Sequence, residues 1–140
     1  MIQNKPNRSA ARKPQTEAER RLQASTDNLG QWIGKTLVRG LHMKANQICY
    51  ERSRAGLTVQ FRKGEEVLEA LGPFKRYQDR AISRLVRMGQ QGLPRRSKDE
   101  TGRFLTVVDG CEWNTPLFYT ETSSGERVVI RFTVSKPCTV

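Results

Sequence analysis

Residues 56–74 read GLTVQFRKGEEVLEALGPF, and this stretch decides which fold the sequence predicts. Leu57, Val59 and Phe61 alternate with polar residues, which predicts a short, half-buried β-strand bounded by glycines. The following run EEVLEALG, residues 65–72, is interpreted as a brief helix that ends at Gly72. Pro73 then fits the first turn of another helix, because its missing N–H would lack a partner there. A strand followed by two helices indicates an α+β chain.

Helical periodicity dominates the sequence before this stretch. Thr16 and Glu19 form a capping-box pattern that predicts a helix start. Apolar residues then recur mostly at spacings of four or seven, at Leu22, Leu29, Ile33, Leu37, Leu41 and Ile48. Gly30 and Gly34 disfavour one continuous helix, and a break with Asp27 capping a second helix stays open. We expect these two glycines to serve close helix packing.

The C-terminal half is predicted to be a loop followed by strands. Residues 90–102 are rich in glycine, proline and charge, which is typical of a loop. Residues 103–109, 116–122 and 126–134 predict three strands, the last two joined by a hairpin turn in TSSGE. The predicted fold is therefore α+β, with N-terminal helices and a small antiparallel sheet of three to four strands packed on helices. Residues 1–14 are predicted to be a flexible basic arm and residues 15–140 a single domain.

Charge is the strongest functional signal in the sequence. The chain has 140 residues, a net charge of +11 and a pI of about 10.2. Residues 1–14 contribute +4 and residues 72–98 contribute +7, whereas residues 99–140 contribute −2. Two basic blocks indicate a polyanionic partner, which means nucleic acid, an anionic membrane or an acidic protein.

The larger basic block predicts a helix over residues 73–89 with two faces. Its apolar face comprises Phe74, Tyr77, Ala81, Leu85 and Met88. Beside that face, arginines recur at steps of four, four and three, at Arg76, Arg80, Arg84 and Arg87. Guanidinium groups in such a row match the spacing and geometry of backbone phosphates. The alternative is a solvated helix face whose charge is partly compensated by Asp79.

We therefore predict a small intracellular protein that binds RNA or DNA, without catalysis of its own and without a cofactor. Its phosphate contacts would come from the helix, the following loop and the N-terminal arm. The candidate residues are Lys75, Arg76, Arg80, Arg84, Arg87, Arg95, Arg96, Lys98, Arg12 and Lys13. An adaptor or inhibitor that docks an acidic protein surface is an open alternative. Oligomeric state stays open.

Two further nucleic-acid modes are weaker. Residues 65–85 contain two predicted helices around a glycine, but Leu68 and Gln78 do not suit a helix-turn-helix. Aromatic residues of the predicted strands could stack on bases, although strand aromatics usually belong to the core. These are Phe104, Phe118, Tyr119 and Phe132.

Reactive residues are few and badly spaced for catalysis or metal binding. His42 and Cys49 share a predicted helix face, and Cys111 and Cys138 could complete a four-ligand set, but zinc-site spacing is absent. The acids beside Cys111 in DGCEWN disfavour its thiolate, so a strand-end turn is expected there. Three cysteines without a close pair predict reduced thiols and a cytoplasmic location. No apolar run approaches the ~18 residues that a membrane span needs.

From residue 57 onward, the order strand, helix pair, basic loop and three strands resembles small RNA-cutting bacterial toxins of the RelE/ParE type. The resemblance covers element order over about 80 residues and no motif. It implies RNA cleavage by side chains on or beside the last strands. In this chain they would be Arg103, Tyr119, Arg127, Arg131 and Lys136.

Overall fold

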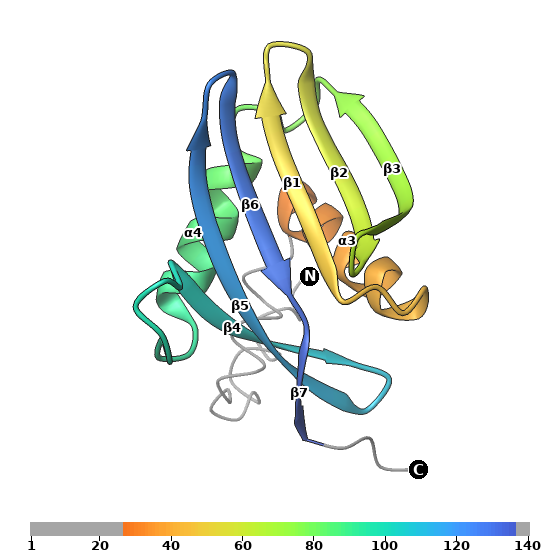
Figure 1. Cartoon of the computed structure of the whole chain (residues 1–140), viewed down its shortest axis with the longest axis vertical. Coiled ribbons are helices and arrows are strands. Elements are labelled where there is room, and N and C mark those ends of the chain that lie inside the picture. The colour runs from red at the N-terminus through yellow and green to blue at the C-terminus, as the bar shows by residue number, and fades with distance from the viewer. Residues whose placement is uncertain (1–26, 137–140) are drawn as a thin grey trace, which may run out of the picture.

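The computed structural model describes residues 27–136, which form a seven-stranded antiparallel sheet with two helices on one face (Figure 1). A helix followed by a three-stranded meander occurs twice. The elements are α3 (Asn28–His42), β1 (Gln47–Ser53), β2 (Gly56–Lys63), β3 (Glu66–Phe74), α4 (Ala81–Gln91), β4 (Gly102–Val108), β5 (Cys111–Thr122), β6 (Gly125–Arg131) and β7 (Thr133–Lys136). The strand order is β3-β2-β1-β6-β5-β4, and β7 pairs with β5. The first and last strands of the two meanders, β1 and β6, join them.

Helix α3 begins where the alternative interpretation placed a break. The carboxylate of Asp27 accepts a hydrogen bond from the N–H of Gly30 at 2.8 Å and caps the helix. Ile33 and Leu37 are buried on its inner face. The helix ends at His42, and the N–H of Met43 donates to the carbonyl of Arg39. The predicted helix start at residue 16 lies outside the described residues.

The interpretation of residues 65–72 as a helix is wrong, because this run forms edge strand β3. β3 pairs with β2 from Lys63↔Glu66 to Leu57↔Phe74, with two register shifts. At these irregularities β3 has an extra residue relative to β2. Leu68, Leu71 and Phe74 are therefore three residues apart, and yet all three pack against the core. Apolar residues three apart imitate helical periodicity, and pairing with β2 decides the conformation.

Strand β1 is a second departure from the predicted fold. Ile48, predicted to extend the helical stripe, lies on this strand and is fully buried beside Tyr50. An added Cβ at Gly40 would lie 2.8 Å from Cδ1 of Ile48, so Gly40 permits close approach of α3 to the sheet. The prediction of a small sheet packed on N-terminal helices is therefore wrong, since β1 and β3 and the division of the last predicted strand into β6 and β7 enlarge the sheet to seven strands.

The predicted basic helix over residues 73–89 is also wrong in its first half. Residues 73 and 74 end β3, residues 75–80 form a turn-rich connection, and α4 begins only at Ala81. Tyr77 has a φ of +65°, a left-handed conformation that no helix interior accepts. The four predicted arginines therefore do not share a helix.

The predicted C-terminal strands are confirmed. They correspond to β4, β5, β6 and β7, and the TSSGE hairpin pairs Thr122 with Gly125. A second two-residue hairpin joins β4 to β5 at Asp109 and Gly110, whose φ values of +53° and +77° suit a type I′ turn. This hairpin fixes the pairing of β4.

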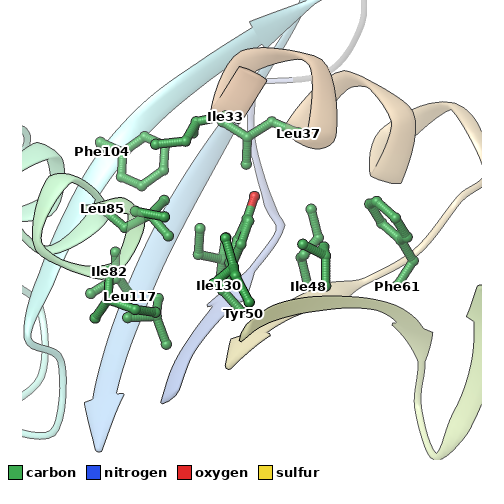
Figure 2. Close-up of a cluster of buried hydrophobic side chains, with 14 of the residues drawn as sticks. Ile33, Leu37, Ile48, Tyr50, Phe61, Ile82, Leu85, Phe104, Leu117 and Ile130 are labelled. Carbon is green, nitrogen blue, oxygen red and sulfur yellow. The ribbon is translucent and has the colours of Figure 1, made fainter. Parts of the chain in front are cut away.

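The core lies between the helices and the sheet (Figure 2). Side chains from α3 and α4, including Ile33, Leu37 and Leu85, meet Ile48 and Leu117 from the strands. Within residues 27–136, neither helix is long and apolar enough to cross a bilayer.

Candidate binding groove

A groove opens between α3, α4 and the edge strand β4. Its volume is about 1300 Å³, and its lining combines apolar side chains with basic and polar ones. Val38 on α3 lines the groove and is 36 % exposed, so the groove presents apolar surface to solvent. We refer to this feature as the α3–α4–β4 groove.

Glycines shape the groove. At Gly102, an added Cβ would lie 2.7 Å from Cα of Gly89, so backbone contact presses α4 against the start of β4. At Gly34, an added Cβ would meet nothing within 4 Å, because this face of α3 borders the groove. The prediction that Gly34 serves close helix packing is therefore wrong.

An ion pair connects α3 and α4 beside the groove. Nη1 of Arg84 donates to Oδ1 of Asp27 at 3.0 Å, and Nη2 donates to the other carboxylate oxygen. These bonds and the N–H of Gly30 lower the pKa of Asp27 to about 2. One predicted phosphate ligand, Arg84, thus already has a carboxylate partner.

A second contact connects the other end of α3 to the β4–β5 hairpin. Nε2 of His42 lies 2.8 Å from Oδ2 of Asp109, and both side chains are exposed. The two contacts bracket the groove along α3. They lie at residues 27 and 42, near the two ends of α3, and the middle of the helix between them borders the groove.

Basic side chains form the rim. Arg39 makes two 2.6 Å bonds to Glu69, which lower the pKa of that carboxyl. Lys35 and Arg87 are exposed, and neither has an acidic partner among the described residues. Within the described part of the chain, the rim therefore offers positive charge without acidic partners above an apolar floor.

The other predicted phosphate ligands lie away from the groove or at its margin. Arg76 and Arg80 flank the ring of Tyr77, with guanidinium carbons 4.8 and 5.7 Å from its centre. Lys75 is exposed beside them. The structure therefore brings Arg76 and Arg80 together around an aromatic ring rather than along a helix.

The predicted basic loop is exposed but folded back on itself. Nη1 of Arg95 donates to the carbonyl of Glu100 at 3.3 Å, while the side chains of Arg96 and Lys98 face solvent. The arm residues Arg12 and Lys13 lie outside the described residues. The loop offers three cations on a surface separate from the groove lining.

The residues that the toxin resemblance singled out do not form one site. Arg103 is buried against Glu100, with two bonds of 2.9 Å. Tyr119 donates to Glu126 at 2.7 Å, which raises the pKa of Tyr119 to about 12. Two more are separated on the sheet: Arg127 pairs with Glu51 and Arg131 lies over Phe118, while the side chain of Lys136 is outside the description. The helix pair that supported the resemblance is also absent, since residues 65–72 are strand.

Cysteine and histidine chemistry differs from the prediction as well. Cys49 is free and buried, and burial raises its pKa, which disfavours the thiolate. His42 contacts Asp109, and Cys49 lies on β1 rather than on its helix. Cys111 is disulfide-bonded, so the prediction of reduced thiols is wrong for this residue. Residues 27–136 contain no group of three or more side chains arranged to hold a metal ion.

Among the groove residues, the sequence prediction singled out Arg84 and Arg87 as phosphate ligands, but it gave no binding role to Lys35 or Val38. Lys35, Val38 and His42 recur at steps of three and four along the outer face of α3, opposite its buried stripe. This second stripe was a detectable signal, but its partner surface on β4 depends on tertiary structure. No protein-family model and no curated protein matches the chain.

Proposed function

We propose that this protein is a binding module that docks an acidic, partly apolar segment of another protein in the α3–α4–β4 groove. The observation that supports the proposal is the combination of an exposed apolar floor with rim cations, Lys35 and Arg87, that have no acidic partner within residues 27–136. Protein interfaces have this arrangement, with an apolar centre that excludes water and a polar edge that selects the partner.

The character of the floor favours protein over nucleic acid. Its apolar side chains are mostly aliphatic, among them Leu37 and Val38. Grooves for single-stranded nucleic acid instead present aromatic rings on which bases stack. The volume of about 1300 Å³ also exceeds the ~300–1,000 Å³ typical of small-molecule pockets.

Nucleic-acid binding is the second candidate function, and a different surface favours it. Arg76, Tyr77 and Arg80 combine two guanidinium groups with one aromatic ring, and Lys75 lies next to them. The loop cations Arg95, Arg96 and Lys98 would add phosphate contacts. About six such contacts would give a log–log salt dependence near −4 to −5.

One titration distinguishes the two functions. The full-length chain is mixed with three labelled probes, and fluorescence anisotropy is followed between about 50 and 300 mM salt. The probes are single-stranded RNA, duplex DNA and a peptide of alternating valine and threonine flanked at each end by two glutamates. The proposal expects tighter binding of the peptide at physiological salt, and a peptide flanked by lysines should bind at least about tenfold more weakly.

Variants locate the binding surface. Reversing the rim charges with Lys35→Glu and Arg87→Glu should weaken peptide binding about tenfold, whereas Lys63→Glu, at the end of β2, is the matched control. Gly34→Leu places a side chain in the groove and should also weaken peptide binding. Arg76→Glu with Arg80→Glu should affect only the nucleic acids. If neither Gly34→Leu nor the rim reversals change the affinity for the peptide, the groove assignment is refuted.

A further inference from the structure

We infer that the segment bound in the α3–α4–β4 groove pairs with β4 as an additional strand, through the backbone of Leu105 and Val107. This inference rests on the proposed function and adds the binding mode. Strand addition at an open sheet edge combines backbone hydrogen bonds for affinity with side-chain contacts for specificity.

β4 has one unpaired edge. It is the last strand of the order β3-β2-β1-β6-β5-β4, and β5 is its only strand partner in the described part of the chain. Residues Phe104 to Val108 of this strand line the groove consecutively. The unpaired edge and the groove are therefore the same place.

The hairpin register shows which backbone groups face the groove. The two-residue turn closes at the pair Val108↔Cys111, and hydrogen-bonded pairs then alternate with non-hydrogen-bonded pairs along the ladder. Leu105 and Val107 fall at non-hydrogen-bonded positions, so their N–H and C=O groups point away from β5. The carbonyl of Arg103, in the same alternation, accepts from the N–H of Leu93 at 2.6 Å on that outer side.

The opposite edge of the sheet is protected, and this contrast makes β4 the edge suited to pairing. β3 contains Pro73 and two register shifts, and it carries Glu66 and Glu69. Proline, bulges and charge are the usual means by which proteins block edge-to-edge pairing. In β4, the stretch Phe104–Val108 has none of them, and its pairing with β5 is regular.

The dimensions of the groove suit one strand. Helix α3 has 15 residues and is therefore about 22 Å long, a distance that an extended segment of about seven residues spans. A strand paired with β4 would place every second side chain on the face that Phe104 shares with α3, beside Leu37 and Val38. Carboxylates near the ends of the segment would then meet the rim cations. Charge complementarity therefore identifies the occupant as an acidic segment.

Amide hydrogen exchange of the full-length chain, measured by NMR with and without the glutamate-flanked peptide, tests this binding mode. Free protein should exchange the amides of Leu105 and Val107 quickly, while those of Phe104 and Thr106, bonded to β5, exchange slowly. Saturating peptide should slow the first pair at least about tenfold. Peptide binding with unchanged exchange at Leu105 and Val107 would refute strand addition and leave the groove proposal intact, whereas no binding would refute both.

A proline substitution gives an independent test. Val107→Pro removes one outward-facing N–H at a position where β5 needs none, so the β4–β5 ladder is retained. It should weaken peptide binding about tenfold, whereas the control Val107→Thr, which keeps the N–H, should change it less than about twofold. Equal affinity of the two variants would contradict the inference. Protection of Leu105 and Val107 in peptide-free protein, together with a dimer in sedimentation velocity, would instead assign the edge to a second copy of the chain.

Discussion

At the scale of single residues, a buried pair of hydroxyl groups joins α3 to β1. The hydroxyl of Thr36 donates to the carbonyl of Ile33 at 2.7 Å and lies 2.5 Å from the hydroxyl of Tyr50. Because a hydroxyl has one proton, Tyr50 must donate to Thr36. Burial raises the pKa of Tyr50 far above its ordinary value, so this proton is retained.

The direction of that bond predicts unequal effects of two substitutions. Tyr50→Phe removes the donor but leaves Thr36 bonded to Ile33, and should reduce the free energy of unfolding by about 1 kcal/mol. Thr36→Val leaves the hydroxyl of Tyr50 buried without an acceptor, and should cost about 1–3 kcal/mol. Urea unfolding of both variants measures the difference. A larger loss for Tyr50→Phe would show that the donor assignment is reversed.

The buried ion pair between Arg103 and Glu100 predicts a second residue-scale effect. Two bonds of 2.9 Å join the side chains, which are 9 % and 4 % exposed. Arg103→Met leaves a buried carboxylate without its partner and should destabilise the fold by about 3–5 kcal/mol. Adding Glu100→Leu to that variant should recover most of the loss. Urea unfolding of the two single variants and the double variant measures this recovery. If the double variant regains no stability, a buried charge is not the cause of the loss.

At the scale of elements, contact between α4 and β4 depends on two glycines. Gly102→Ala would place a methyl group 2.7 Å from Cα of Gly89, so α4 must move away from the sheet. We expect a clear loss of thermal stability, on the order of several degrees per kcal/mol lost. Gly34→Ala meets no neighbour within 4 Å and should stabilise α3 by up to about 1 kcal/mol. Thermal unfolding that ranks the two variants in the reverse order would contradict this packing.

The element scale also shows why the sheet could not be predicted in full. β2, β4, β5 and β6 have regular alternation or hairpin turns, which depend on local sequence. β3 also follows a two-residue hairpin, which pairs Lys63 with Glu66, but its irregular pairing with β2 spaces Leu68, Leu71 and Phe74 by three and hides the alternation. β1 directly follows α3, and its buried Ile48 continues the helical spacing of that element. Both strands owe their conformation to pairing with other strands, β3 with β2 and β1 with β2 and β6, rather than to their own apolar spacing.

For the molecule as a whole, we expect the stability of the folded state to fall at acidic pH. Hydrogen bonds from arginine or tyrosine lower the pKa values of Glu69, Glu100 and Glu126, and that of Asp27 falls to about 2. Carboxyls with lowered pKa values in the folded state stabilise it above the unfolded pKa and lose that contribution as pH falls through the folded pKa. Stability should therefore decline from near pH 4.5 towards pH 2.

Urea midpoints measured at several pH values check this decline. Asp27→Asn keeps a capping side chain but removes the charge, so the loss of stability at the acid end of the range should become shallower. A variant with an unchanged pH profile would mean that the Asp27–Arg84 pair does not contribute.

Local patterns determined the α3 stripe, the TSSGE hairpin and the C-terminal strands, because each depends on neighbours within a few positions, and composition determined the excess of basic residues. Tertiary structure decided which cations are paired with acids, which are buried and which are exposed. Arg84 is neutralised by Asp27, Arg103 is buried with Glu100, and Arg87 reaches the groove rim. The groove itself joins residues about seventy positions apart, from Val38 to Val107. Charge and periodicity can be read from the local sequence. The groove surface forms only through long-range packing of helices and strands, and the binding proposals depend on that surface.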